Sequence, residues 1–189
     1  MEMKMNQAQN EFLEKLKVLL QDQYEISRTD TGLLMILPGL GMQEEGVAAE
    51  LMFYPHVSEV EDDRSGVLQI YITVCNYREE NAVQTTLRLE ELTKRANVGH
   101  FGLYHDASII YYRYCVTLAD IESRYALQTV CVALANMSEL LNYLYDYIVI
   151  MGDDVNAMTL EEYDEGMDEL ITFMQEDPDF LDKLRQEEE

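Results

Sequence analysis

The feature that most constrains this fold is a long segment, residues 125–151, which contains neither glycine nor proline. Its apolar residues recur every three or four positions, which places them on one face of an α-helix. A second apolar row lies beside the first, so the apolar arc is wider than that of an ordinary surface helix. We therefore expect the core to assemble on this helix. The first row is Leu127, Val130, Leu134, Met137, Leu141, Leu144, Ile148 and Met151, and the second is Ala126, Ala133, Leu140 and Tyr147.

Several earlier segments alternate between apolar and polar residues, which is typical of β-strands with one buried face. The clearest is 67–76, in which Leu68, Ile70, Ile72 and Val74 point one way. A second strand is expected at 47–54, with its own alternating apolar residues. Strand material is also expected at 24–26 and 33–37 around a turn at 28–32, and a hairpin is expected at 101–105 and 108–118.

Helical periodicity is also present at 6–22 and 79–96. Because these helices alternate with strand runs joined by short turns, the sequence predicts an α+β fold. We expect a twisted, mainly antiparallel sheet of about five strands packed on helices, in the order α-β-β-β-α-β-β-α. This single domain spans 1–151.

The composition changes after the long helix. Residues 152–189 hold 15 acidic and two basic residues. Thr159 with Glu162 three positions later forms a capping box, which predicts a helix over about 160–175. We expect 152–189 to be an acidic helical extension whose helix carries an apolar stripe. The residues of this stripe are Leu160, Tyr163, Met167, Leu170, Ile171 and Met174.

The formal charge of −24 limits the classes of partner. Nucleic acids and anionic lipids both require neutralisation by lysine and arginine, so we expect neither partner. A basic protein partner fits the charge better. Polar residues interrupt the long helix, so we do not expect it to span a membrane. The N-terminus has no secretory apolar region, and Cys75, Cys115 and Cys131 are expected to be buried free thiols, which together favour a cytoplasmic location.

The element order, the acidic character and the lack of a catalytic motif over about residues 5–150 resemble the bacterial sensory transduction regulator family. The fold of that family is similar to that of type III secretion chaperones. The resemblance implies a non-enzymatic, protein-binding and often dimeric module. It rests on element order, so it supplies no functional residues for this chain.

No short motif in the sequence predicts a cofactor, a metal site or catalytic residues. Gly39 and Gly41 begin like a dinucleotide fingerprint, but a strand follows them where a helix is required. The segment from Asp154 to Glu165 lacks the ligand and the glycine that an EF-hand loop needs. The three histidines have no metal-ligand spacing.

The candidate functional residues are therefore those of a protein interface, where tyrosine and arginine are common anchors. Tyr111 and Arg113 share one face of a predicted strand. Arg113 either pairs with an acid of its own fold or contacts a partner. The other candidates lie on the long helix and on the tail helix. They are Tyr143, Tyr147, Met167 and Ile171.

Three functions stay open at the level of sequence. The first is a non-catalytic, chaperone-like or regulatory protein-binding module, expected to be a homodimer. The second is an acidic decoy or immunity-type protein that masks a basic partner through its C-terminal extension. The third is an enzyme without a recognisable motif. The wide apolar arc of the long helix is expected to be covered either by the tail helix or by a second subunit.

Overall fold

The computed structural model describes residues 5–41, 46–54, 65–96 and 98–177. The fold is α+β, as predicted. The elements in chain order are α1 (Gln7–Leu20), β1 (Glu25–Arg28), β2 (Gly32–Leu37), β3 (Val47–Phe53), β4 (Gly66–Asn76), the 3-10 turn η1 (Glu79–Asn81), α2 (Ala82–Arg95), β5 (His100–Tyr104), the 3-10 turn η2 (His105–Ala107), β6 (Ile109–Leu118), α3 (Arg124–Asp153) and α4 (Leu160–Glu176).

The strands form one antiparallel sheet in the order β1-β2-β3-β4-β6-β5. It has six strands, whereas the sequence predicted about five, with three before the second helix. The difference arises because β1 and β2 are separate strands of one hairpin. Thr29 N donates to Gly32 O at 3.0 Å, and this bond closes the tight turn between them.

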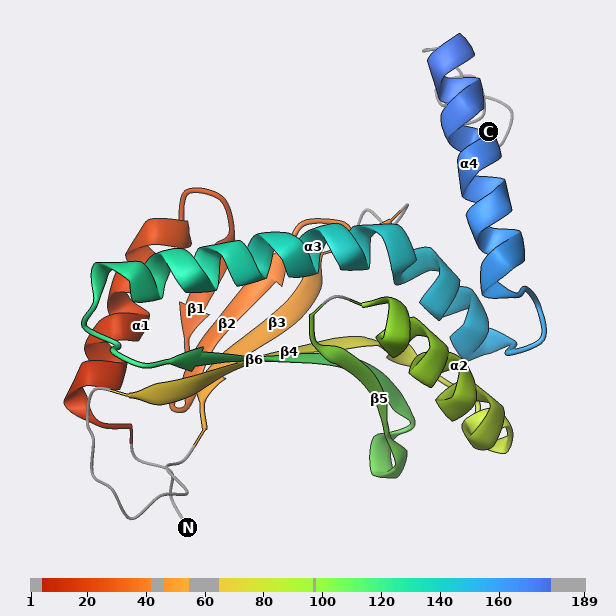
Figure 1. The fold of residues 1–189 in the computed structure, drawn as a ribbon. Coiled ribbons are helices and arrows are strands. Elements are labelled where there is room, and N and C mark those ends of the chain that lie inside the picture. The colour runs from red at the N-terminus through yellow and green to blue at the C-terminus, as the bar shows by residue number, and fades with distance from the viewer. Residues whose placement is uncertain (1–4, 42–45, 55–64, 97, 178–189) are drawn as a thin grey trace.

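The core lies between the sheet and the helices α1 and α3, which cross the same face of the sheet (Figure 1). The predicted strand alternation is confirmed, because Leu68, Ile70, Ile72 and Val74 of β4 are all buried. The expected apolar face of α3 is also confirmed along most of its length. Its fully buried members include Val130, Met137, Leu141 and Ile148.

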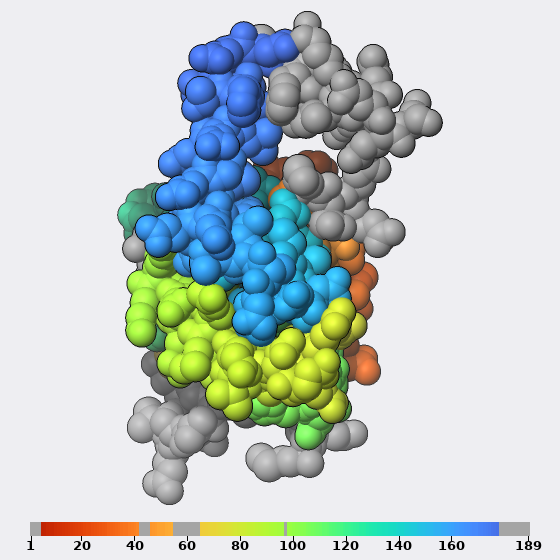
Figure 2. Space-filling model, turned by 90° about the vertical axis from the view of Figure 1, so that its right-hand side faces the viewer, coloured from red at the N-terminus to blue at the C-terminus, as the bar shows by residue number. Residues whose placement is uncertain are grey.

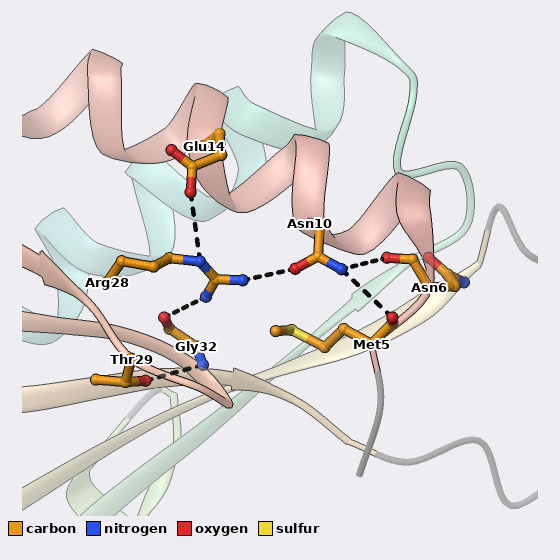
Figure 3. A network of polar contacts seen from close by, with 7 residues as sticks. All are labelled: Met5, Asn6, Asn10, Glu14, Arg28, Thr29 and Gly32. Atoms are coloured by element: carbon orange, nitrogen blue, oxygen red, sulfur yellow. Dashed lines mark hydrogen bonds and ion pairs between the residues drawn. The ribbon is translucent and has the colours of Figure 1, made fainter.

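A polar network fixes α1 to the β1–β2 hairpin (Figure 3). Arg28 extends from the end of β1 to the helix, where its Nη2 donates to Asn10 Oδ1 at 2.7 Å and its Nε lies 3.3 Å from Glu14 Oε1. Arg28 Nη1 also donates to the carbonyl of Gly32. Asn10 in turn donates to the carbonyl of Asn6 at 2.8 Å. One guanidinium therefore joins the first helix to the edge hairpin.

The C-terminal end of α3 passes very close to the end of β4. A Cβ atom on Gly152 would lie 2.5 Å from the carbonyl oxygen of Asn76, closer than real Cβ contacts allow. The helix also accepts a hydrogen bond here, because Arg78 N donates to Gly152 O at 3.2 Å. Glycine at this position therefore lets α3 end against the sheet, and this fixes where α4 can begin.

Within the described residues, no helix is long and apolar enough to cross a lipid bilayer.

If α3 organises the core, a substitution on its buried face must lower the free energy of unfolding far more than one on its exposed face. Leu141 is 0% exposed, and Leu141→Ala should lower the free energy of unfolding by about 2–5 kcal/mol, because it leaves a cavity. Val132 on the same helix is 52% exposed, and Val132→Ala should change it by less than about 0.5 kcal/mol. Urea unfolding measures both, and equal effects would contradict the assignment of the buried face.

Candidate protein-interaction surfaces

The helix α4 begins against the body and then projects away from it (Figure 1). Its first apolar residues, Leu160 and Tyr163, are buried, whereas Ile171 and Met174 further along are 44% and 41% exposed. Figure 2 shows the first turns of α4 lying against α2 and the end of α3, with later turns extending beyond them. The predicted capping box is present, because Thr159 Oγ1 accepts from Glu162 N at 3.2 Å.

A small cluster attaches the base of α4 to both neighbouring helices. Asp164 of α4 forms an ion pair with Arg95 of α2, and Tyr143 of α3 donates to Asp164 Oδ1 at 2.8 Å. Tyr163 donates to the carbonyl of Tyr143 at 2.9 Å. We call Arg95, Tyr143 and Asp164 the latch.

The latch perturbs the ionisation of its own groups. Burial, followed by the hydrogen bond to Asp164, raises the pKa of Tyr143 to about 12. Burial alone would raise the pKa of Asp164, but the hydrogen bonds from Arg95 and Tyr143 outweigh it and hold that pKa below its ordinary value. Asp164 therefore stays ionised, and the latch persists, down to acidic pH.

Beyond the latch, α4 is an acidic helix with an apolar stripe that becomes exposed towards its C-terminal end. We define the outer stripe as Met167, Leu170, Ile171 and Met174; the first two are half-buried and the last two exposed. Phe173 beside it is 52% exposed. The helix carries seven acidic residues and no lysine or arginine. These acids are Glu161, Glu162, Asp164, Glu165, Asp168, Glu169 and Glu176.

The four helical candidates from the sequence separate into different environments. Met167 and Ile171 lie in the outer stripe, and Tyr143 is 40% exposed within the latch. Tyr147 is only 1% exposed, so it is a core residue and offers no surface to a partner. Its ring packs against the Tyr163 ring, with the centroids 5.4 Å apart, which explains why an apparent surface position is covered.

The wide apolar arc of α3 is mostly buried, because Ala126, Val130, Ala133 and Leu134 towards its N-terminus are at most 5% exposed. Tyr125 and Val132, which lie outside the arc, are 58% and 52% exposed. A groove of about 320 Å³ lies beside them, lined by α3 and by Tyr114 of β6. Polar and apolar residues share this groove. Its lining is Tyr114, Tyr125, Gln128, Thr129, Val132, Ala133 and Asn136. The homodimer expected from the sequence stays a prediction.

The second surface is the face of the sheet opposite α1 and α3. The strand register aligns Glu50 of β3, Tyr71 of β4, Arg113 of β6 and His100 of β5 in one row across this face. The next row places Tyr111 beside them. We call Tyr54, Tyr71, His100, Tyr111 and Arg113 the tyrosine–arginine face.

Arg113 lies at the centre of this surface and contacts neutral groups. Its Nε donates to His100 Nε2 at 3.1 Å, and its Nη1 donates to Tyr54 Oη at 3.3 Å. None of the ion pairs among the described residues includes Arg113. The sequence left open whether Arg113 pairs with an acid of its own fold. Within the described part of the chain it does not.

Aromatic rings form a platform next to the guanidinium. The rings of Tyr71 and Tyr111 are stacked with centroids 5.1 Å apart, and His100 meets Tyr111 edge-on at 6.3 Å. A side chain on Gly102 would collide with the Tyr111 ring at 2.6 Å, so this glycine leaves room for the platform.

The cysteines differ from the sequence expectation. All three are free thiols, but Cys115 is exposed rather than buried, because it lies on the open face of β6. Cys75 and Cys131 are partly buried. Burial, with a smaller contribution from Asp153, raises the pKa of Cys75 to about 12.

Sequence reasoning found Tyr111 and Arg113 but missed Tyr54, Tyr71 and His100. The alternation of β4 indicated that Tyr71 points away from the core. The sequence does not show that β4 and β5 both pair with β6, because these strands are far apart in the chain, and only that pairing brings Tyr71 and His100 next to Arg113. The latch was missed for the same reason, since it joins three helices.

No protein-family model matches the chain, and no curated protein is significantly similar to it. The resemblance to the sensory transduction regulator family therefore stays a prediction, as does the cytoplasmic location. Among the described residues, no group of three or more His, Cys, Asp or Glu side chains is arranged to hold a metal ion.

The latch predicts that Asp164→Ala loosens α4. The substitution removes the acceptor of both Arg95 and Tyr143, so the amides of α4 should exchange with solvent roughly threefold to tenfold faster. Asp168→Ala is the matched control, because it removes the same charge one turn later and leaves the latch intact. Hydrogen–deuterium exchange measures both variants, and equal exchange in them would show that the latch does not hold α4.

The Arg113–His100 contact predicts a pH effect. Burial, and then the charge of Arg113, lowers the pKa of His100 from its ordinary value of 6.5. The folded state thus favours the neutral ring, so the stability due to His100 rises with pH between the lowered pKa and about 6.5. NMR titration should show the His100 pKa below 6.5, and Arg113→Gln should raise it. A pKa at or above 6.5 in the parent chain would refute this account.

Proposed function

We propose that this chain is a non-catalytic protein-binding module, regulatory or chaperone-like in kind, and that the projecting part of α4 binds a basic protein partner. The observation that carries the proposal is the outer stripe. Ile171 and Met174 stay exposed, with Phe173 beside them, on a helix whose other exposed side chains are mostly acidic. Contiguous exposed apolar side chains with a charged border are typical of interaction sites.

The spacing of the outer stripe suits recognition of a helix in a groove. Met167, Leu170, Ile171 and Met174 follow the three- and four-residue steps with which an amphipathic helix enters an apolar groove. Methionine adapts to irregular partner surfaces because its side chain is unbranched and flexible. The buried first turn and the latch hold the helix in place, which lowers the entropy cost of binding.

The charge of α4 favours a basic partner over a second copy of this chain. Pairing two α4 helices through their outer stripes would place two sets of seven carboxylates side by side, and such like-charge juxtaposition is unfavourable. A groove bordered by lysine and arginine would instead gain from the same charges, and the association would be faster at low salt.

The acidic decoy is the second candidate function. This function is supported by the same seven carboxylates of α4, and it requires no contact between the partner and apolar side chains of that helix. Residues 178–189 of the predicted acidic extension lie outside the described residues. The two functions differ in which side chains of α4 matter. A decoy depends on the acids alone, whereas a groove-binding helix also depends on the outer stripe.

Three variants separate these alternatives. Ile171→Ser with Met174→Ser removes the exposed end of the outer stripe while the latch stays intact. Glu165→Gln with Glu169→Gln removes charge without touching the stripe. The matched control carries Val83→Ser and Leu87→Ser on α2, where these apolar side chains are 70% and 57% exposed.

The experiment captures partners from a lysate of the cells that naturally produce this protein. Titration calorimetry then measures the affinity of each variant for the captured protein. We expect a partner with a basic surface, whose affinity falls at least about tenfold with the stripe variant and changes little with the α2 control. The charge variant should weaken binding chiefly at low salt. If only the charge variant matters, the chain is a decoy. If neither variant matters, α4 is not the binding element and the proposal fails.

A further inference from the structure

We propose that the tyrosine–arginine face is a second binding site, which takes a polypeptide segment that is apolar except for a single carboxylate. This inference uses the open face of the sheet and is independent of α4 and of the proposed function. The carboxylate binds Arg113, and an apolar or aromatic side chain next to it packs on Tyr71 and Tyr111.

The first argument is the unused binding capacity of Arg113. A guanidinium has five N–H donors, and here Nε and one proton of Nη1 are used, by His100 and Tyr54. No other described residue accepts a hydrogen bond from Arg113, so with respect to the described part of the chain the fork made by Nη1 and Nη2 can take a bidentate carboxylate. In a chain with 37 acidic residues, a guanidinium in the middle of a sheet without a carboxylate among the described residues is unusual.

The second argument is that Arg113 is already positioned. Its contacts with His100 and Tyr54 hold the side chain on the sheet, so little rotamer entropy is lost when a ligand binds. The charge of Arg113 also helps keep His100 neutral, and in that state the ring nitrogen accepts the Nε proton. The guanidinium is thus aligned by neutral groups, which leaves its positive charge uncompensated within the cluster.

The third argument concerns what surrounds the charge. The Tyr71 and Tyr111 rings are stacked on adjacent strands, β4 and β6, roughly 5 Å apart. An aromatic surface beside an arginine is the composition of protein-interface anchor sites. The ligand therefore needs an apolar group within one residue of its carboxylate.

Charge limits the ligand to one carboxylate. Glu50 lies in the same row, on the other side of Tyr71, and the whole chain carries a charge of −24. An acidic segment would gain one contact at Arg113 and be repelled by its surroundings. A single carboxylate in an apolar context avoids this cost.

The open geometry favours a polypeptide over a small acid. Small ligands bind in concave sites that enclose most of their surface. Here the side chains stand on a sheet face across three strands, and Tyr71, Arg113 and His100 are all partly exposed. A segment of several residues can cover this area, whereas a small carboxylic acid can cover only part of it.

The test uses three fluorescently labelled heptapeptides, each ending in leucine and phenylalanine. The first two share one apolar sequence and differ only at the C-terminus, which is a free carboxylate in one and an amide in the other. The third is amidated and has one internal residue replaced by glutamate. Fluorescence anisotropy with the full chain measures affinity, and NMR of tyrosine ring carbons locates the site. We expect at least one of the two carboxylate peptides to bind at least about tenfold more tightly than the neutral one.

The variants test the role of Arg113. Arg113→Gln should abolish the difference between carboxylate and neutral peptides. Arg113→Lys keeps the charge and disturbs the fold least, but it lacks the fork, so it should retain only part of the difference. Arg88→Gln on α2 is the control with the same loss of charge, and it should leave binding unchanged. Far-ultraviolet circular dichroism checks that each variant is folded.

The outcomes also separate the sources of the carboxylate. Tighter binding of the free-acid peptide identifies a C-terminal carboxylate, and tighter binding of the glutamate peptide identifies a side chain. Either supports the proposal. It is overturned if all three peptides bind equally or none binds, or if Arg113→Lys or Arg113→Gln retains the full preference. If the peptides stop binding to the variant with Ile171→Ser and Met174→Ser but still bind to the Arg113 variants, the peptide site is on α4 and the proposal is also overturned.

Discussion

The burial of α3 against one face of the antiparallel sheet is the interaction on which the rest of this structure depends. Met137, Leu141 and Ile148 are all 0% exposed, and a fully buried side chain of this size contributes about 1.5–3 kcal/mol. Because α3 and α1 occupy the same face, the opposite face carries no described helix (Figure 1). The end of α3 against β4 then fixes the base of α4.

Both proposed binding surfaces follow from this arrangement. The helix α4 buries its first turn and half-buries Met167, whereas the end of its outer stripe, Ile171 and Met174, is exposed where the helix extends beyond the body (Figure 2). The open sheet face keeps its polar and aromatic residues, and the register places Arg113 between Tyr71 and His100. One surface is apolar with an acidic border, and the other is aromatic with a single cation. They therefore suit partners of different chemistry.

The sequence predicted those parts of the fold that depend on local patterns. The helical period of α3, the alternation of β4 and the Thr159 capping box each involve residues close together in the chain. It did not predict contacts that depend on long-range pairing. The burial of Tyr147 requires Tyr163 from another helix, and the neighbours of Arg113 come from β4 and β5. The candidate site was thus found as isolated residues, and the structure was needed to show which of them meet.

Residue-resolved hydrogen exchange of the native chain tests the central claim most directly. If α3 and β4 form the core, their amides should be the slowest in the molecule and should exchange only through global unfolding, whereas the outer half of α4 should exchange far faster. Amides of 130–148 that exchange as fast as those of 168–176 would show that α3 is not the organising element, and the assignment of both surfaces would fall with it.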